Sequence, residues 1–349
     1  MNKFLKILIF ILLIFIVSFN VLDKEDVIPK EDTTVKVPRN VNAIYLNSFY
    51  LTKEARFEKV ISIIKETEIN SVVIDIKDYS GKIYLNSSNE ELNKYGAQQA
   101  YIKMDKIVER LHNENVYVIA RIVVFEDPIL ATKNPNLALK DKEGNLWKTY
   151  ASNLWIDPNS KEAWDYNILV AKEASKIGFD EINFDYIRFP SDGALSDIDY
   201  SSHNASKREV MLSFYKYLSA SLKDIIISAD FFGLTTIIDD IGVGQNIEDA
   251  SPYFNFICPM VYPSHYSSNF DGFLNPSEYP YEIVFKSLSE ANKKIDNIRP
   301  WLQAFDLLGF EYRREEIQKQ IEASKDALLD NYTGYMLWNS QNYYNIEDL

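Results

Sequence analysis

Residues 181–190 read EINFDYIRFP, and their first half carries the clearest strand pattern of the chain. Successive side chains of a β-strand point to opposite faces. Glu181, Asn183 and Asp185 therefore share one face, whereas Tyr186 shares the other with the apolar residues in between. In a closed parallel barrel, one face of each strand lines the lumen and the other packs against helices. The stretch predicts a barrel strand with a polar lumen face that ends at Asp185.

From Asn40 onwards, short runs rich in β-branched and aromatic residues alternate with helical patterns. This alternation is typical of β/α units around a parallel sheet. The expected strands are Ala43–Asn47, Ser71–Lys77, Val116–Val124, Glu181–Asp185, Ile225–Asp230, Asn255–Tyr262, Ile298–Ala304 and Gly334–Asn339. They predict an α/β fold, a single-domain (β/α)8 barrel over residues 40–349.

Helical patterns fill the segments between these strands. Thr52 is expected to cap the first helix, and Ser160 a later helix that Gly178 ends. Further helices are expected at 206–223, 281–294 and 313–329. Few residues follow the eighth strand, so the last helix should be short or missing.

A doubly wound open sheet is the main structural alternative. A G-x-G-x-x-G turn after the first strand would support it. No such turn follows the first expected strand, and the barrel is therefore preferred.

Composition and charge limit the classes of partner. The chain has 349 residues, 46% of them hydrophobic, and a formal net charge of -14. Nucleic acid is bound mainly through Lys and Arg, so it is not an expected partner. Cys258 is the only cysteine, which excludes an intramolecular disulfide. We expect no metal or other cofactor, because the histidines lack close metal-ligand spacing: His112, His203 and His265.

Residues 1–22 are predicted to be a targeting segment. Lys3 and Lys6 precede an apolar run at 7–17, and no further charge occurs before Asp23. A basic flank and an apolar run are typical of an export signal. The short run favours a cleaved signal peptide, whereas the lack of an A-x-A-like cleavage site favours an uncleaved signal anchor. A buried helix of the globular domain is the remaining alternative.

Residues 23–39 mix charges of both signs with two prolines and show no hydrophobic period, as expected of a charged linker. By the positive-inside rule, the basic flank stays in the cytoplasm. The membrane would be contacted through residues 4–22, and the domain at 40–349 would face outwards. We therefore expect a single-pass protein of the cell membrane, or a secreted protein if residues 1–22 are cleaved.

Polar residues also fall on the lumen side of other expected strands. Strand parity groups Asp230 with Ser228, and Asp75 with Lys77, while Arg121 can point inwards from the third strand. Active sites of such barrels form at the C-terminal strand ends. We expect these residues at one barrel mouth: Asp75, Lys77, Arg121, Asp185 and Asp230.

A cluster of this kind has two interpretations. Buried charges are costly unless they pair, and perturbed groups concentrate at functional sites. An ion pair of Asp75 with Lys77 or Arg121 would instead be structural, and a single strand-end carboxylate is often a cap or a loop ligand. Both interpretations stay open at this point.

Glycoside hydrolysis needs two carboxyl groups that flank the scissile bond, one protonated and one ionised. Asp185 and Asp230 on neighbouring strands can supply them if their environments differ. On the seventh strand Gln303 and Asp306 have opposite parity, so both reach the lumen only if the strand ends between them. The residues expected to position a sugar are Arg188, Tyr262, His265, Gln303 and Trp338.

Six motifs carry a resemblance to known proteins. They are VIDIKD at 73–78, IARIVVF at 119–125, WIDP at 155–158, EINFDYIRFPSDG at 181–193, PMVYPSHY at 259–266 and RPWLQ at 299–303. Together they resemble a family of bacterial exported proteins assigned to the glycoside hydrolases, of TIM-barrel glycosidase type and distantly α-amylase-like. The resemblance covers about residues 40–349. It implies a barrel and a hydrolase, but no particular substrate.

The resemblance to the α-amylase-like group also implies site residues. That group has an Asp nucleophile after strand four, an acid on strand five and a third carboxylate after strand seven. Asp185, Asp230 and Asp306 are similar in position. The group has Glu where this sequence has Asp230, and Arg where it has Asn183. Alternative acids therefore lie on the loop after strand five: Asp239, Asp240 and Glu248.

The sequence thus predicts a cell-surface glycoside hydrolase that acts on an extracellular or cell-wall polysaccharide, with Asp185 as nucleophile or base and Asp230 as acid. The alternative is a non-catalytic polysaccharide-binding barrel that has lost a working acid. A different hydrolase or lyase is the third hypothesis, because one barrel fold hosts many chemistries.

Overall fold

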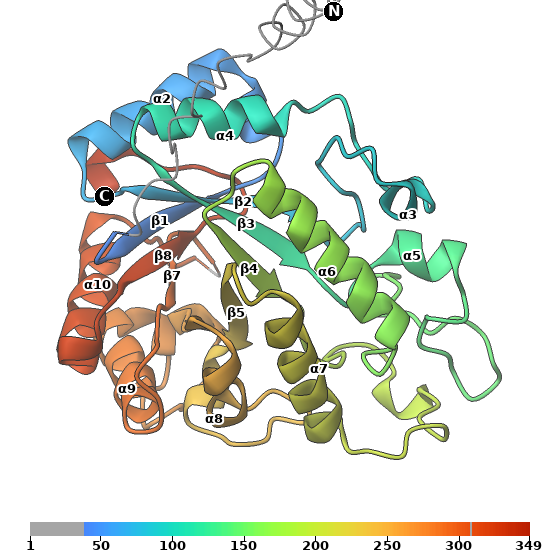
Figure 1. Cartoon of the computed structure of the whole chain (residues 1–349). Helices are drawn as coiled ribbons and strands as arrows, with labels where there is room; N and C mark the ends of the chain where they lie inside the picture. Colours follow the sequence, from blue (N-terminus) through green and yellow to red (C-terminus); the bar gives the residue numbers. More distant parts are fainter. Residues whose placement is uncertain (1–37, 308) are drawn as a thin grey trace, which may run out of the picture. The chain divides into compact units, whose positions relative to one another are not determined.

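The computed structural model describes residues 38–307 and 309–349 and shows a closed barrel of parallel strands (Figure 1). Each strand pairs with the next in sequence, and the last pairs with the first. The strands are β1 (Val41–Leu46), β2 (Ser71–Lys77), β3 (Tyr117–Val123), β4 (Glu181–Asp185), β5 (Ile226–Phe232), β6 (Phe256–Met260), β7 (Trp301–Gln303) and β8 (Gly334–Trp338). The predicted (β/α)8 barrel is confirmed.

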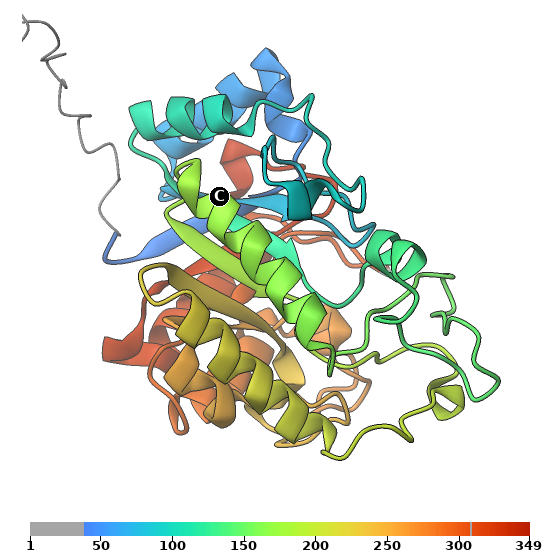
Figure 2. The same ribbon diagram turned by 45° about the vertical axis from the view of Figure 1, so that its right-hand side comes forward.

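Helices surround the ring of strands (Figures 1 and 2). They are α2 (Glu54–Glu66), α3 (Glu90–Asn93), α4 (Met104–Asn113), α5 (Pro128–Lys133), α6 (Lys161–Lys176), α7 (Lys207–Ser221), α8 (Ile247–Ala250), α9 (Pro280–Asn292) and α10 (Arg314–Leu328). After β8 the described chain has only a 3-10 turn at Ile346–Asp348. The expectation of a short or missing last helix is therefore confirmed.

Two of the expected helix starts have different outcomes. The Ser160 side chain accepts a hydrogen bond from the Ala163 N–H group, so Ser160 caps α6 as predicted. The prediction for Thr52 is wrong, because Thr52 belongs to a separate 3-10 turn and its hydroxyl donates to the Phe49 carbonyl. The helix α2 begins only after Lys53, which provides no side-chain cap.

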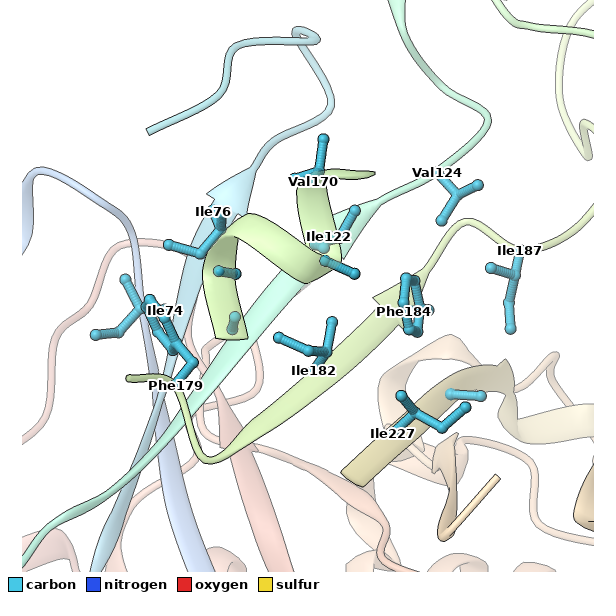
Figure 3. Packing of buried hydrophobic residues seen from close by; sticks show 14 of the residues in the cluster. Ile74, Ile76, Ile122, Val124, Val170, Phe179, Ile182, Phe184, Ile187 and Ile227 are labelled. Carbon is cyan, nitrogen blue, oxygen red and sulfur yellow. The ribbon is translucent and has the colours of Figure 1, made fainter. Parts of the chain in front are cut away.

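The outward faces of neighbouring strands form the main core beneath α6. Ile122 of β3 and the outward pair Ile182 and Phe184 of β4 are fully buried, and Val170 of α6 belongs to the same cluster (Figure 3). This packing confirms the predicted parity of β4 within the strand. The polar face of β4 is therefore left to the lumen.

A buried polar cluster occupies the lumen below the strand ends. The Arg299 Nη1 atom donates to both Glu181 oxygens at 2.9 Å, and the Ser228 hydroxyl donates to Glu181 Oε1 at 2.6 Å. Arg299 and Glu181 are fully buried. A sealed pair of this kind is expected to act structurally, because breaking it would leave an uncompensated buried charge.

The predicted targeting segment at 1–22 lies outside the described residues, as does all but the last part of the linker at 23–39. Their roles therefore stay predictions. In the described part of the chain, no helix combines the length and the apolar character needed to cross a membrane.

Candidate active site

A cavity of about 150 Å³ opens where the barrel strands end. It brings together several residues that the sequence predicted for the site: Arg121, Asp185, Arg188, Asp230, Tyr262 and Trp338. The remaining lining residues are Tyr186, Phe232, Met260 and Trp301. The cavity therefore lies at the mouth where such barrels carry their active sites.

Arg121 connects the carboxyl groups of the site. Its Nη2 donates to Asp185 Oδ2 at 2.5 Å, and its Nη1 donates to Asp75 Oδ1 at 2.6 Å. Its Nε lies 3.9 Å from Asp230 Oδ2, which is too far for a hydrogen bond. Burial opposes the charge of Arg121, but the carboxylates around it, Asp185 foremost, raise its pKa well above the usual value. The guanidinium is therefore a permanent cation between three carboxyl groups.

Asp230 has a different environment. Burial, followed by the nearby charge of Asp185, raises the pKa of Asp230 well above its usual value. Its Oδ1 accepts hydrogen bonds from Asn183 Nδ2 at 2.8 Å and Trp301 Nε1 at 2.7 Å. Because both donors form their hydrogen bonds with Oδ1, we expect the proton of the neutral carboxyl group on Oδ2, the oxygen that lies nearer to Arg121. The site thus pairs a carboxyl group that favours protonation with one that is ion-paired.

The chain turns sharply directly after Asp185. Tyr186 has a φ of 53°, in the left-handed region that non-glycine residues rarely adopt. Its N–H group donates to Asp185 Oδ1 at 2.6 Å, and its side chain lines the cavity. The prediction that Tyr186 shares the outward face of Phe184 is wrong, because the strand ends at Asp185 and its alternation ends there too.

Aromatic rings form one wall of the cavity. Trp338 stacks on Tyr45 with a centroid separation of 4.0 Å and meets Trp301 edge-on at 5.5 Å. Tyr262 lines the same cavity, and burial raises its pKa well above the usual value, so its hydroxyl keeps its proton. The rings offer an apolar surface with hydrogen-bond donors beside it, which suits a sugar.

Lys77 lies apart from this cavity, and its predicted grouping with Asp75 is wrong. The register of β2 against β3 shifts between Asp75 and Lys77. The Lys77 Nζ is fully buried, lies 2.8 Å from Asp127 Oδ2 and donates to the Val123 carbonyl at 2.7 Å. The ion pair that the sequence left open for Asp75 is formed with Arg121.

A second hollow of about 450 Å³ shares Tyr262 and Trp338 with the cavity, and His265 and Asp306 line it. Asp306 is exposed and forms an ion pair with Arg313 at 2.6 Å. It is therefore not the third carboxyl group beside Asp185, a place that Asp75 takes through Arg121.

Other predicted residues line neither hollow. Gln303 is buried, accepts from the Ser264 N–H group at 3.2 Å and donates to the Phe305 carbonyl at 2.9 Å, so it braces the loops after β6 and β7. The alternative acids are exposed: Asp239 and Asp240 on the loop after β5, and Glu248 in α8. Asp230 is therefore the better placed acid.

Sequence reasoning missed Tyr45 and Trp301. The Tyr45 hydroxyl donates to Asp75 Oδ2, and the Trp301 indole donates to Asp230. Alternation along β1 and β7 was the available signal, but it needs the strand bounds. Within residues 38–307 and 309–349, no group of three His, Cys, Asp or Glu side chains is placed to hold a metal ion.

A closed (β/α)8 barrel with two carboxyl groups at its mouth, one with a raised pKa and one ion-paired, has the architecture of a glycoside hydrolase. Residues 43–344 match the model of the family described as "Putative glycosyl hydrolase domain". The chain belongs to this family, which confirms the resemblance seen in its motifs. No curated protein matches the chain.

Solved structures give the same fold. A hypothetical protein from Ruminiclostridium thermocellum is 35% identical with a TM-score of 0.51, and the match covers 54% of this chain and 96% of that chain. The α-galactosidase of Thermus thermophilus is 12% identical with a TM-score of 0.55, over 89% of this chain and 60% of that chain. The spore cortex-lytic enzyme SleL of Bacillus cereus is 12% identical with a TM-score of 0.51, over 89% and 73%. The last two show the fold alone.

Proposed function

We propose that the protein hydrolyses glycosidic bonds in an extracellular or cell-wall polysaccharide, with Asp230 as general acid and Asp185 as nucleophile or base. One observation carries this proposal. The two carboxyl groups line one cavity, yet burial favours the neutral form of Asp230 while Arg121 pairs with Asp185. Glycosidases need this division of protonation states.

The contacts of Asp230 support its role as the acid. Its Oδ2 proton would pass to the glycosidic oxygen as the bond to the anomeric carbon breaks. The Oδ2 atom then carries negative charge, and Arg121 Nε lies 3.9 Å away with no hydrogen bond of its own to any described residue. Attraction to this cation, together with the hydrogen bonds from Asn183 and Trp301, would stabilise the Asp230 carboxylate formed in this step.

The contacts of Asp185 suit the second role. Arg121 and the Tyr186 N–H group hold its two oxygens in a fixed orientation. From there the carboxylate would attack the anomeric carbon directly, or take a proton from the attacking water. The separation of the two carboxyl groups in a substrate complex decides between these routes, at about 5–5.5 Å for retention and 6.5–9.5 Å for inversion.

The second hollow supports a substrate of more than one sugar unit. It shares Tyr262 and Trp338 with the cavity and is larger, at about 450 Å³. A polysaccharide would place the reacting sugar beside Asp185 and a neighbouring unit in the hollow. The basic flank, apolar run and charged linker of residues 1–39 support a location outside the cytoplasmic membrane.

The test is release of reducing sugar from cell-wall and capsular glycans by the purified protein and by Asp185→Asn. We expect release by the wild type and none by the variant. Equal release by both proteins would remove Asp185 from the mechanism. Binding of a glycan without turnover by either protein would favour the non-catalytic alternative.

A further inference from the structure

Arg188 is a buried cation without a carboxylate partner. Its side chain lines the cavity beside Asp185 and Asp230, and the residue is only 8% exposed. None of the ion pairs among the described residues includes Arg188, although Asp185 and Glu126 attract it at longer range. Removing a charge from water is costly unless a partner compensates it. The fold therefore maintains a guanidinium without a paired carboxylate in the wall of the cavity, with Asp185, Glu126 and Asp192 attracting it only at longer range.

Aromatic rings hold Arg188 in place. The guanidinium carbon lies 4.5 Å from the ring centre of Phe232, 4.9 Å from that of Tyr186 and 5.1 Å from that of Trp155. Such contacts orient a guanidinium and compensate part of its charge. These ring contacts do not provide hydrogen-bond acceptors for the N–H groups of Arg188, which lie in the plane of the guanidinium. This leaves Arg188 rigid and available to a ligand.

One edge of the Arg188 guanidinium has no hydrogen-bond partner. The Nη1 atom donates to the Phe189 carbonyl at 3.0 Å and to the Ser191 hydroxyl at 3.2 Å. The Nε and Nη2 atoms make no hydrogen bond to any residue that the structure describes, and neither is sealed from solvent. These two N–H groups are parallel and match the two oxygens of a carboxylate.

We propose that Arg188 binds the carboxylate of an acidic sugar, so that the substrate is a polysaccharide containing uronic acid. This inference rests on the proposed function and names its substrate class. The parallel edge of Arg188 would accept the planar carboxylate in a bidentate pair. A neutral sugar offers only hydroxyl groups at that position and leaves the buried charge uncompensated.

The direct test compares two forms of one glycan pool. Wall and capsular preparations are digested by the full-length protein before and after chemical reduction of their carboxyl groups to alcohols. We expect reduction to lower the initial rate of reducing-sugar release about 10- to 100-fold, the loss expected for a charge-assisted bidentate pair. Equal or faster release from the reduced pool, with Asp185→Asn inactive on both, overturns the inference and leaves the proposed function standing.

Phosphate is the other anion that a guanidinium binds. A third pool is therefore treated to remove phosphate esters but keeps its carboxyl groups. Unchanged release from this pool supports the uronic-acid substrate. Loss of release here, combined with full release from the carboxyl-reduced pool, overturns the inference in favour of a phosphorylated glycan.

Arg188→Met supplies an independent test. In this variant, the ratio of the rates on untreated and carboxyl-reduced glycan should fall towards one. The ratio for Arg188→Lys should be intermediate, because lysine keeps the positive charge but cannot form the bidentate pair. Arg208→Met is the matched control, since Arg208 presents the same Nε and Nη2 edge to Asp249 on the surface. An unchanged ratio in a folded Arg188→Met protein overturns the inference. If that variant does not fold, the comparison of wild-type rates still decides.

Discussion

The aspartates at the ends of β4 and β5 differ in what their oxygens contact. Asp185 accepts hydrogen bonds from a guanidinium and a backbone N–H group. Asp230 accepts from neutral donors, Asn183 and the Trp301 indole, and is 1% exposed. Asp230 thus favours its protonated form, whereas Asp185 is ion-paired with Arg121, and the proposed division of roles follows from this difference.

Replacing Asp230 tests its proposed role as the acid. We expect Asp230→Asn to lower kcat on natural glycans about 10²- to 10⁴-fold, the usual contribution of a general acid. Wild-type activity needs the protonated form and should fall as the pH rises through the raised pKa of Asp230. The alkaline limb of the pH–rate profile should disappear in the variant. Asp326→Asn, which changes an exposed carboxylate on α10, is the control and should keep the wild-type profile.

The same group links stability to pH. The pKa of Asp230 is higher in the folded than in the unfolded chain, so its stabilising contribution is complete below the unfolded-state pKa. That contribution is lost as the pH rises through the raised folded-state pKa. Asparagine does not ionise, so Asp230→Asn should lose less unfolding free energy than the wild type over this range. Denaturant titrations at several pH values measure the unfolding free energy of both proteins. Parallel losses of unfolding free energy with rising pH would contradict a raised pKa of Asp230.

Strand parity predicted which side of the barrel many of the site residues face. It placed Asp185, Asp230 and Arg121 in the lumen because all three lie within regular strands. It failed for Lys77, where the register shifts, and for Tyr186, where the backbone leaves the strand conformation. Neither irregularity has a signature in residue type, so alternation alone could not reveal it.

Lys77, the last residue of β2, forms a buried ion pair with Asp127, the residue that caps α5. Lys77→Met would leave the Asp127 carboxylate, which is 0% exposed, without its cation. We expect a loss of about 3–5 kcal/mol in unfolding free energy, because an unpaired buried charge remains. The kcat/KM of the folded variant should stay close to the wild-type value, since Lys77 does not line the cavity.

Lys294→Met is the comparison for this change. It removes a cation from an exposed Asp239, where the loss should be about 0–1 kcal/mol. Urea unfolding measures both variants. Similar stability losses in the two would show that the Lys77 pair is not the structural link described.

The closure of the barrel depends on a glycine at the start of β8. Gly334 has a φ of 103°, and a Cβ atom there would collide with the Val41 backbone of β1. Gly334→Ala should therefore lower the unfolding free energy by about 2–4 kcal/mol, from backbone strain and overpacking together. Gly144 has a φ of 85° but open space around it, so Gly144→Ala isolates the strain and should lose about 1 kcal/mol. Equal losses would contradict a steric requirement at the β1–β8 seam.

Element bounds agreed with the prediction in two of the strands. The bounds of β2 and β4 agree with the sequence prediction, and their residues are all buried. The strand β7 is shorter than predicted, because Ile298 pairs with Ile257 of β6 only as an isolated bridge, separate from the pair of Met260 and Trp301. The hydrogen bonds between neighbouring strands determine where a strand ends, and the composition of one strand does not reveal those hydrogen bonds.

At the scale of the whole molecule, the repeat of strand and helix makes the barrel predictable, while the cavity depends on loops. The second hollow includes Asp306 and residues after β8, which belong to no predicted element. Residues far apart in sequence meet there, so alternation carries no information about their distances. The protonation pattern likewise depends on burial that only the folded barrel supplies.

The central claim is that Asp185 and Asp230 divide the work of glycosidic hydrolysis. It is tested most directly by the kcat/KM values of wild type, Asp185→Asn and Asp230→Asn on an aryl glycoside of the sugar that the enzyme releases, beside the natural glycan, because kcat/KM reports the step in which the leaving group departs. A good leaving group needs no proton. We expect Asp230→Asn to keep activity on the aryl glycoside and to lose it on the glycan, while Asp185→Asn loses both. Retained activity of Asp185→Asn on either substrate would contradict it.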